Sequence, residues 1–172
     1  MSQFHRRPLW AGLMASVLAG ALLLGASHAA AQSLKDQIVG TWKLVSIYNE
    51  KDGVRRDIFG PTPMGILIYD RNGNYASIIV RSGLPKFASK NREQGTADEN
   101  RAVVQGSIAM FGTYTVGADG QVSLKREGST YPNRTGTTET RTCTISGDEM
   151  KEVNPTPAIA SGTSYLTWTR AK

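Results

Sequence analysis

Short runs in which apolar and polar residues alternate make up most of the chain and predict β-strands. The first run spans residues 38–49 and keeps the period of two that a pleated strand imposes on its side chains. One face carries Trp42, Leu44, Ser46 and Tyr48, and the other carries Thr41, Lys43, Val45 and Ile47. One face must meet a core, and Gly40 lets the backbone turn tightly while the indole of Trp42 plugs the closed end of a small barrel. This run therefore predicts the first strand of a ligand-holding barrel.

Turn residues separate the later runs and predict an all-β fold. The clearest hairpin joins residues 65–70 to residues 74–81 through Asn72-Gly73, which supplies the positive φ angles of a tight turn. Further strands are expected at residues 54–59, 108–116, 121–126, 137–145, 149–153 and 163–170. Such regular short strands are typical of a sandwich or an up-and-down barrel. We interpret the chain as a single up-and-down antiparallel β-barrel of about eight to nine strands.

One short helix is expected between the two halves of the sheet. Thr96 precedes the segment, and Glu99 follows three residues later, which is the spacing of a capping box. The pattern predicts a helix within residues 96–105, where a barrel could use it as a lid or a side brace.

The first 31 residues have the organisation of a cleaved export signal. Arg6 and Arg7 precede an apolar block at residues 9–26, and small residues occupy the positions that signal peptidase reads before a cut after Ala31. We predict that residues 32–172 form one periplasmic or secreted domain with no stable membrane insertion after cleavage. Sec export is favoured over twin-arginine export, and residues 1–35 contain no cysteine that could carry a lipoprotein anchor. An uncleaved membrane anchor is the alternative, because the apolar block could just span a bilayer.

Cleavage would leave the mature chain without histidine, because His5 and His28 both lie in the signal. That removes Ser-His-Asp and Cys-His catalysis and histidine-ligated zinc, iron or haem, so we expect no metal and no cofactor. Cys143, the one cysteine, can form no internal disulfide and reads more readily as a small buried hydrophobe than as a nucleophile. Losing Arg6 and Arg7 lowers the net charge from +6 to +4. The remaining basic pairs lack interleaved aromatic residues, so no nucleic-acid partner is expected.

Four motifs in order give the chain a resemblance to a known family. They are Val39-Gly-Thr-Trp-Lys-Leu-Val-Ser46, Phe59-Gly-Pro-Thr-Pro-Met-Gly-Ile-Leu-Ile-Tyr-Asp70, Phe111-Gly-Thr-Tyr-Thr-Val116 and Leu166-Thr-Trp-Thr-Arg170. With them the mature chain resembles the bacterial lipocalin-like domain family over essentially its whole length. The resemblance implies a calycin-type barrel of about eight antiparallel strands that holds one small, mostly apolar molecule.

The same resemblance assigns a structural role to the two ends of the chain. In lipocalins a basic side chain from the last strand covers the Gly-x-Trp signature of the first, and here Gly40, Trp42 and Arg170 match that arrangement. Cation–π packing of Arg170 on Trp42 is one reading, and a solvated strand end is the other. The chain lacks the cysteine pair of secreted vertebrate lipocalins, so disulfide closure is not carried over.

Residues in strands that are large enough to line a lumen and can form hydrogen bonds are the candidate ligand contacts. The candidates are Tyr48, Tyr69, Tyr75, Tyr114, Arg81, Arg126, Arg141 and Trp168. For any one of them, wall packing or an outer surface is the alternative. The strand at residues 137–145 is polar on both faces, so it lies at an edge or points polar groups such as Glu139 and Arg141 into a wet cavity.

The leading functional hypothesis is an exported protein that binds or carries one small hydrophobic or aromatic molecule in the barrel lumen. The alternative is a histidine-free isomerase or cyclase of the same shape that uses Tyr, Glu or Arg, although no catalytic residue is assigned. A third reading is a structural module with a filled barrel and an apolar outer patch. The sequence leaves the oligomeric state open.

Overall fold

The computed structural model describes residues 34–117, 119–158 and 161–172. The expected export signal at residues 1–31 lies outside these described residues. The described chain contains nine strands, which are β1 (Gly40–Lys51), β2 (Val54–Arg56), β3 (Pro63–Tyr69), β4 (Asn74–Arg81), β5 (Ser107–Val116), β6 (Gln121–Ser129), β7 (Thr138–Ser146), β8 (Glu149–Asn154) and β9 (Thr163–Arg170). Its helical segments are residues 34–38, the 3-10 turns η1 (Arg92–Gln94) and η2 (Pro132–Arg134), and the helix α2 (Ala97–Gly106).

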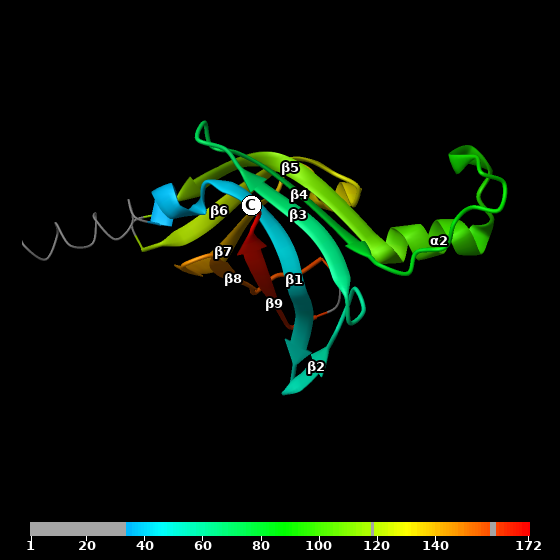
Figure 1. Ribbon diagram of the computed structural model, residues 1–172, viewed down its shortest axis with the longest axis horizontal. Helices are drawn as coiled ribbons and strands as arrows, with labels where there is room; N and C mark the ends of the chain where they lie inside the picture. Colours follow the sequence, from blue (N-terminus) through cyan, green and yellow to red (C-terminus); the bar gives the residue numbers. More distant parts are fainter. Residues whose placement is uncertain (1–33, 118, 159–160) are drawn as a thin grey trace, which may run out of the picture.

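The strands form one antiparallel sheet that closes on itself (Figure 1). Its order is β2-β1-β3-β4-β5-β6-β7-β8-β9, and β1 also pairs with β9, so eight strands make a closed barrel and β2 is an extra strand at its edge. The predicted up-and-down barrel and its single short helix are therefore confirmed. The strand expected at residues 54–59 is shorter than predicted, because β2 ends at Arg56 and the next residues, Ile58 and Phe59, are buried.

A bulge in β1 changes which of its residues face the interior. β1 pairs with β9 as Leu44 with Trp168 and then Ser46 with Thr167, so Val45 has no partner. An extra residue of this kind bends a strand and resets its alternation. After the bulge, Ile47 and Asn49 are the buried residues of β1.

One end of the barrel is closed by the first and last strands. Trp42 and Trp168 are fully buried there, and Trp42 Nε1 donates to the carbonyl of Ile38 at 2.8 Å. The guanidinium of Arg170 lies over the Trp42 ring at 4.1 Å and donates to the carbonyls of Val39 at 3.1 Å and Gln37 at 2.7 Å. Gly40 has a φ of +137°, and a Cβ there would meet Arg170 Nη1 at 2.8 Å, so a glycine is required where the guanidinium crosses.

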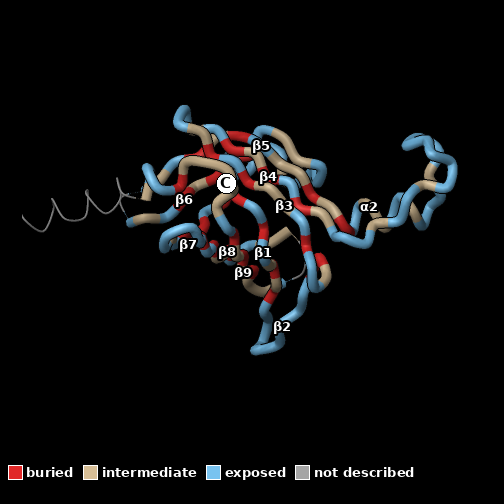
Figure 2. The backbone as a smooth tube through the Cα atoms, viewed as in Figure 1, coloured by how far each residue is buried: buried red, intermediate tan, exposed pale blue. Residues whose placement is uncertain are grey.

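The segment from residue 82 to α2 extends away from the barrel (Figure 1) and is mostly exposed (Figure 2). The capping box predicted for α2 is present, because Thr96 Oγ1 accepts from the amide of Glu99 and Glu99 Oε2 accepts from the amide of Thr96. Within the described ranges, no helix has the length and apolar character needed to cross a membrane.

Candidate functional site

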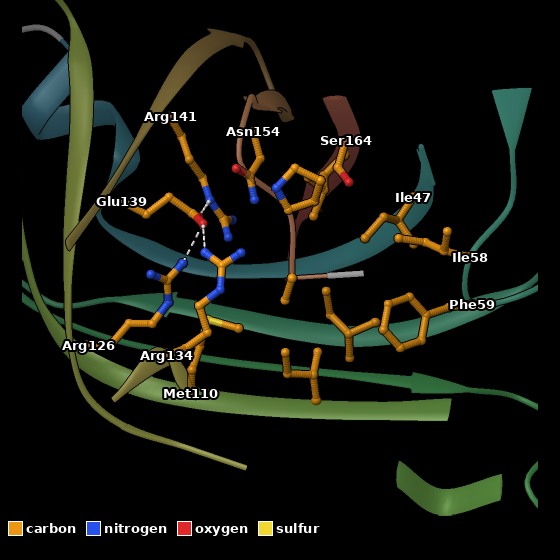
Figure 3. A pocket seen from close by; sticks show the side chains of 15 residues that line it. Ile47, Ile58, Phe59, Met110, Arg126, Arg134, Glu139, Arg141, Asn154 and Ser164 are labelled. Carbon is orange, nitrogen blue, oxygen red and sulfur yellow. Dashed lines mark hydrogen bonds and ion pairs between the residues drawn. The ribbon is translucent and has the colours of Figure 1, made fainter. Parts of the chain in front are cut away.

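A pocket partly open to solvent occupies the barrel beyond the closed end (Figure 3). The empty space between its walls, its mouth included, is about 470 Å³, and the centres of water-sized molecules can occupy about 50 Å³ of it. Strands and three connecting segments supply its lining, which is Ile47, Ile58, Phe59, Ile79, Ile108, Met110, Arg126, Arg134, Glu139, Arg141, Asn154, Pro157, Ala158, Ser164 and Leu166. The pocket therefore combines an apolar part with a charged part.

Isoleucine, leucine and phenylalanine side chains form the apolar part. Ile79 of β4 lies beside its cross-strand partner Ile108 of β5, and Ile47 of β1 lies beside its partner Leu166 of β9. Phe59 comes from the chain after β2 and is 1% exposed. Side chains of this kind bind guests through the burial of apolar surface rather than through directed bonds.

The charged part is a cluster of three arginines and two glutamates, which we call the ion cluster: Arg126, Arg134, Glu139, Arg141 and Glu152. Three guanidinium groups converge on Glu139 (Figure 3), with Arg126 Nη2 at 2.6 Å, Arg134 Nη1 at 2.9 Å and Arg141 Nε at 2.6 Å from its oxygens. Burial alone would raise the pKa of Glu139, but Arg141 and Arg126 more than offset that effect, so its pKa lies below the usual range. Glu139 is therefore ionised and saturated with donors, which makes it a poor general base.

Glu152 forms the deeper layer of the ion cluster, nearer the closed end. Its Oε2 accepts from Trp168 Nε1 at 2.8 Å and Arg141 Nη1 at 3.3 Å, and its Oε1 accepts from the Tyr69 hydroxyl at 3.2 Å. Burial, followed by the charge of Glu152, raises the pKa of Tyr69 and that of the Cys143 thiol. Burial would lower the pKa of Arg141, but Glu152 and Glu139 raise it overall, so this guanidinium stays charged.

Two buried polar atoms, one in the ion cluster and one outside it, have no hydrogen-bond partner among the described residues. They are the hydroxyl of Tyr75 and Nε of Arg126, on side chains that are 3% and 2% exposed. Leaving such a donor unsatisfied costs about 1–3 kcal/mol, and more when it is charged. Most buried polar groups in folded proteins have partners, so this pair is unusual.

The structure brings together six of the eight residues that the sequence pattern proposed as lumen contacts. Their side chains are all buried inside the barrel: Tyr69, Tyr75, Tyr114, Arg126, Arg141 and Trp168. Of these six, Arg126 and Arg141 line the pocket itself. The Tyr114 hydroxyl is used by the wall, because it donates to the carbonyl of Asp70 at 2.7 Å.

The other two predicted contacts, Tyr48 and Arg81, were wrong as lumen residues. The β1 bulge turns Tyr48 outward, where it stacks on Tyr165 with ring centroids 5.0 Å apart and Arg55 lies 3.9 Å above its ring. Arg81 is the last residue of β4 and is exposed, with Nη2 only 3.4 Å from the carbonyl of Ile58 at the barrel rim. Alternation with an unbroken period puts Tyr48 on the face of Trp42, and the bulge changes that, whereas for Arg81 the alternative of an outer surface is the one that the structure shows.

Sequence reasoning missed Glu152 and Arg134. Glu152 has the same parity in β8 as Met150 and Asn154, and all three are buried. That period-2 signal was visible, but two of the three residues are polar. Arg134 belongs to η2, outside any strand, so no alternation marked it.

No group of three or more His, Cys, Asp or Glu side chains that could hold a metal occurs in the described part of the chain. The chemistry that the pocket offers is apolar contact together with guanidinium and hydroxyl donors.

A closed up-and-down barrel with a pocket in one end defines the class of cup-shaped β-barrels to which lipocalins belong. Residues 39–171 match the sequence model of the lipocalin-like domain family, and the chain belongs to that family. It is also similar to the 4'-hydroxy-3'-methoxypropiophenone carrier protein ppsC of Aspergillus oryzae (strain ATCC 42149 / RIB 40). The two are 32% identical over 100 residues, which cover 52% of this chain and 90% of that protein.

Proposed function

We propose that this protein is an exported carrier that binds one small, mostly apolar aromatic molecule in the barrel pocket. The observation that carries the proposal is the pocket itself, in which isoleucine and phenylalanine walls face buried arginines. The name of the similar protein, a 4'-hydroxy-3'-methoxypropiophenone carrier protein, supports the same class of guest. Export is supported by the basic, apolar and small-residue order of residues 1–31.

Burial of apolar guest surface supplies the driving force for binding. Each 100 Å² of apolar surface removed from water contributes about 2.5 kcal/mol before the entropic cost of association. Because the space open to water-sized molecules is about 50 Å³, the guest is small or the mouth yields when it enters. Pro157 and Ala158 line the pocket from the loop between β8 and β9, and Ile58 and Phe59 line it from the segment between β2 and β3, so these parts of the wall lie outside regular structure and can yield.

Neighbouring residues of β4 provide a matched test of the site. Ile79 faces the pocket and is 5% exposed, whereas Ile78 faces outward and is 46% exposed. We expect Ile79→Phe to weaken binding of 4'-hydroxy-3'-methoxypropiophenone, used as the probe, by about tenfold or more, because the added ring occupies the guest's space. Ile78→Phe should leave the dissociation constant unchanged. Isothermal titration calorimetry measures both, and equal effects of the two variants would count against a guest in this pocket.

Native mass spectrometry of protein isolated from its own host tests carriage and export together. We expect a retained, chemically unmodified small molecule on a chain that has the mass of residues 32–172. A full-length mass in the cytosolic fraction would contradict export. Conversion of an added candidate guest into a product by the wild-type protein would favour the isomerase or cyclase alternative over a carrier.

A further inference from the structure

The ion cluster contains one more positive charge than negative charge. Three guanidinium groups, from Arg126, Arg134 and Arg141, face the two carboxylates of Glu139 and Glu152, which leaves a charge of +1. The side chains of Arg126 and Arg141 are 2% and 8% exposed and that of Arg134 is 18% exposed, so bulk water screens the excess poorly at the two inner arginines. A buried charge of this kind calls for a counter-charge at the site.

The two unpartnered donors lie in one row of the barrel wall. Tyr75 of β4 pairs with Gly112 of β5, and Gly112 pairs in turn with Arg126 of β6. Paired residues point to the same face of a sheet, so the tyrosine and the arginine both point inward with a bare glycine between them. A Cβ at Gly112 would come within 2.8 Å of the amide nitrogen of Glu127, so residue 112 cannot contribute a side chain between them.

The row borders the pocket. Arg126 lines it, and so does Met110, the inward-facing residue two positions before Gly112 on β5 (Figure 3). Two of the Arg126 nitrogens are used, because Nη1 donates to Thr137 Oγ1 at 3.1 Å and Nη2 pairs with Glu139, and only Nε is free. Methionine is a flexible side chain that can move aside for a guest.

We propose that the guest carries one negatively charged oxygen group, a carboxylate or a phenolate, which accepts hydrogen bonds from Arg126 Nε and the Tyr75 hydroxyl. This inference rests on the proposed carrier function and adds the chemical class of the guest. One negative charge brings the ion cluster to neutrality, whereas a dianion would leave it with a charge of −1. Burial raises the pKa of Tyr75 even though Arg126 and Arg141 act to lower it, so its hydroxyl remains a donor at neutral pH.

The test compares two probes of the same shape and different charge, trans-cinnamate and cinnamamide, by isothermal titration calorimetry on the full-length protein at neutral pH. We expect the dissociation constant of cinnamate to be about tenfold or more lower than that of cinnamamide, because hydrogen bonds to an ionised acceptor are the stronger ones. Tyr75→Phe removes only the unpartnered oxygen. It should lower the ratio of the cinnamamide dissociation constant to the cinnamate dissociation constant by about threefold or more. Arg126→Lys keeps the charge and the pairing with Glu139 but loses Nε, and it should narrow the ratio as well.

Tyr165→Phe is the control, because this tyrosine stacks on Tyr48 outside the barrel and should leave the ratio unchanged. Equal affinity of the wild-type protein for the two probes overturns the inference and leaves the carrier proposal standing. A ratio that persists in both variants overturns the assignment to these two donors. If the wild-type protein binds none of the three compounds, cinnamate, cinnamamide and 4'-hydroxy-3'-methoxypropiophenone, the carrier proposal is overturned and this inference with it. Should Arg126→Lys fail to fold, Tyr75→Phe still decides the question.

Discussion

Glu139 is the residue on which the charged half of the pocket depends. Its side chain is 1% exposed, and its two oxygens accept from guanidinium groups of β6, η2 and β7. Taking one carboxylate and three guanidinium groups out of water is expensive, and mutual attraction compensates only because every partner is in place. Removing the carboxylate leaves the arginines buried against one another.

We expect Glu139→Gln to lower the free energy of unfolding by about 3–5 kcal/mol, which is the usual cost of removing one partner from a buried ion pair. Urea denaturation followed by circular dichroism measures the change. The control is Glu149→Gln, because Glu149 pairs with Lys151 at 3.2 Å on the surface, where the two side chains are 53% and 63% exposed. That variant should stay within about 0.5 kcal/mol of the wild type, and equal losses in the two variants would contradict a stabilising role for Glu139.

Residue identities predicted part of this site and could not predict the rest. Glu139 and Arg141 were expected either at a sheet edge or pointing into a cavity, and the structure buries both inside the barrel and pairs them at 2.6 Å. Arg126, Arg134 and Glu152 complete the cluster from three other elements. Those contacts depend on which strands lie side by side, and one chain read by itself does not contain that information.

At the scale of elements, local signals were reliable and long-range ones were not. The Asn72-Gly73 turn and the capping box at Thr96 involve residues within four positions of each other, and both form. In the turn, Gly73 takes the predicted positive φ, +88°, whereas Asn72 does not. The bulge at Val45 left no local signal, because β1 offers apolar residues on both faces. Its position is set by the way β1 must bend to pair with β3 at one end and β9 along its length.

The α2 helix should depend on its cap more than on the barrel. It packs mainly against its own flanking segment, and Glu99 also accepts from the amide of Ala88 at 2.8 Å. We expect Thr96→Ala to weaken the helix by about 1 kcal/mol, seen as faster amide exchange over residues 97–106 by hydrogen-exchange mass spectrometry. Exchange in the barrel strands should be unchanged.

Thr144→Ala is the comparison for that experiment, because Thr144 is an exposed residue of β7 with no capping role. The same slow exchange over residues 97–106 in Thr96→Ala as in Thr144→Ala would show that the cap does not hold the helix.

For the whole molecule, the groups with shifted pKa values determine how the stability of the fold changes with pH. The lowered pKa of Glu139 contributes stability that is present above the ordinary glutamate value of about 4.3 and is lost as pH falls through the folded-state value. The raised pKa values of Cys143, Tyr69 and Tyr75 act in the opposite sense. Their stabilisation is complete below the unfolded-state values, about 8.5 for cysteine and about 10 for tyrosine, and is lost as pH rises through the folded-state values.

We therefore expect thermal midpoints to form a plateau between about pH 5 and pH 8 and to fall on both sides of it. Differential scanning fluorimetry across the range measures this profile. In Cys143→Ala the alkaline decline should begin near pH 10 rather than near pH 8.5, because only tyrosines then remain to ionise in the unfolded chain. An unchanged alkaline limb in that variant would contradict the assignment to the thiol.

The closed end of the barrel at Trp42 and Trp168 limits how a bound molecule can enter and leave the pocket. Because Arg170 covers that end from outside, the pocket opens toward the other end of the barrel, and we expect a bound molecule to enter and leave there. If the protein is a carrier, as we propose, a partner that receives the bound molecule would contact it at that open end, beside Pro157 and Ala158.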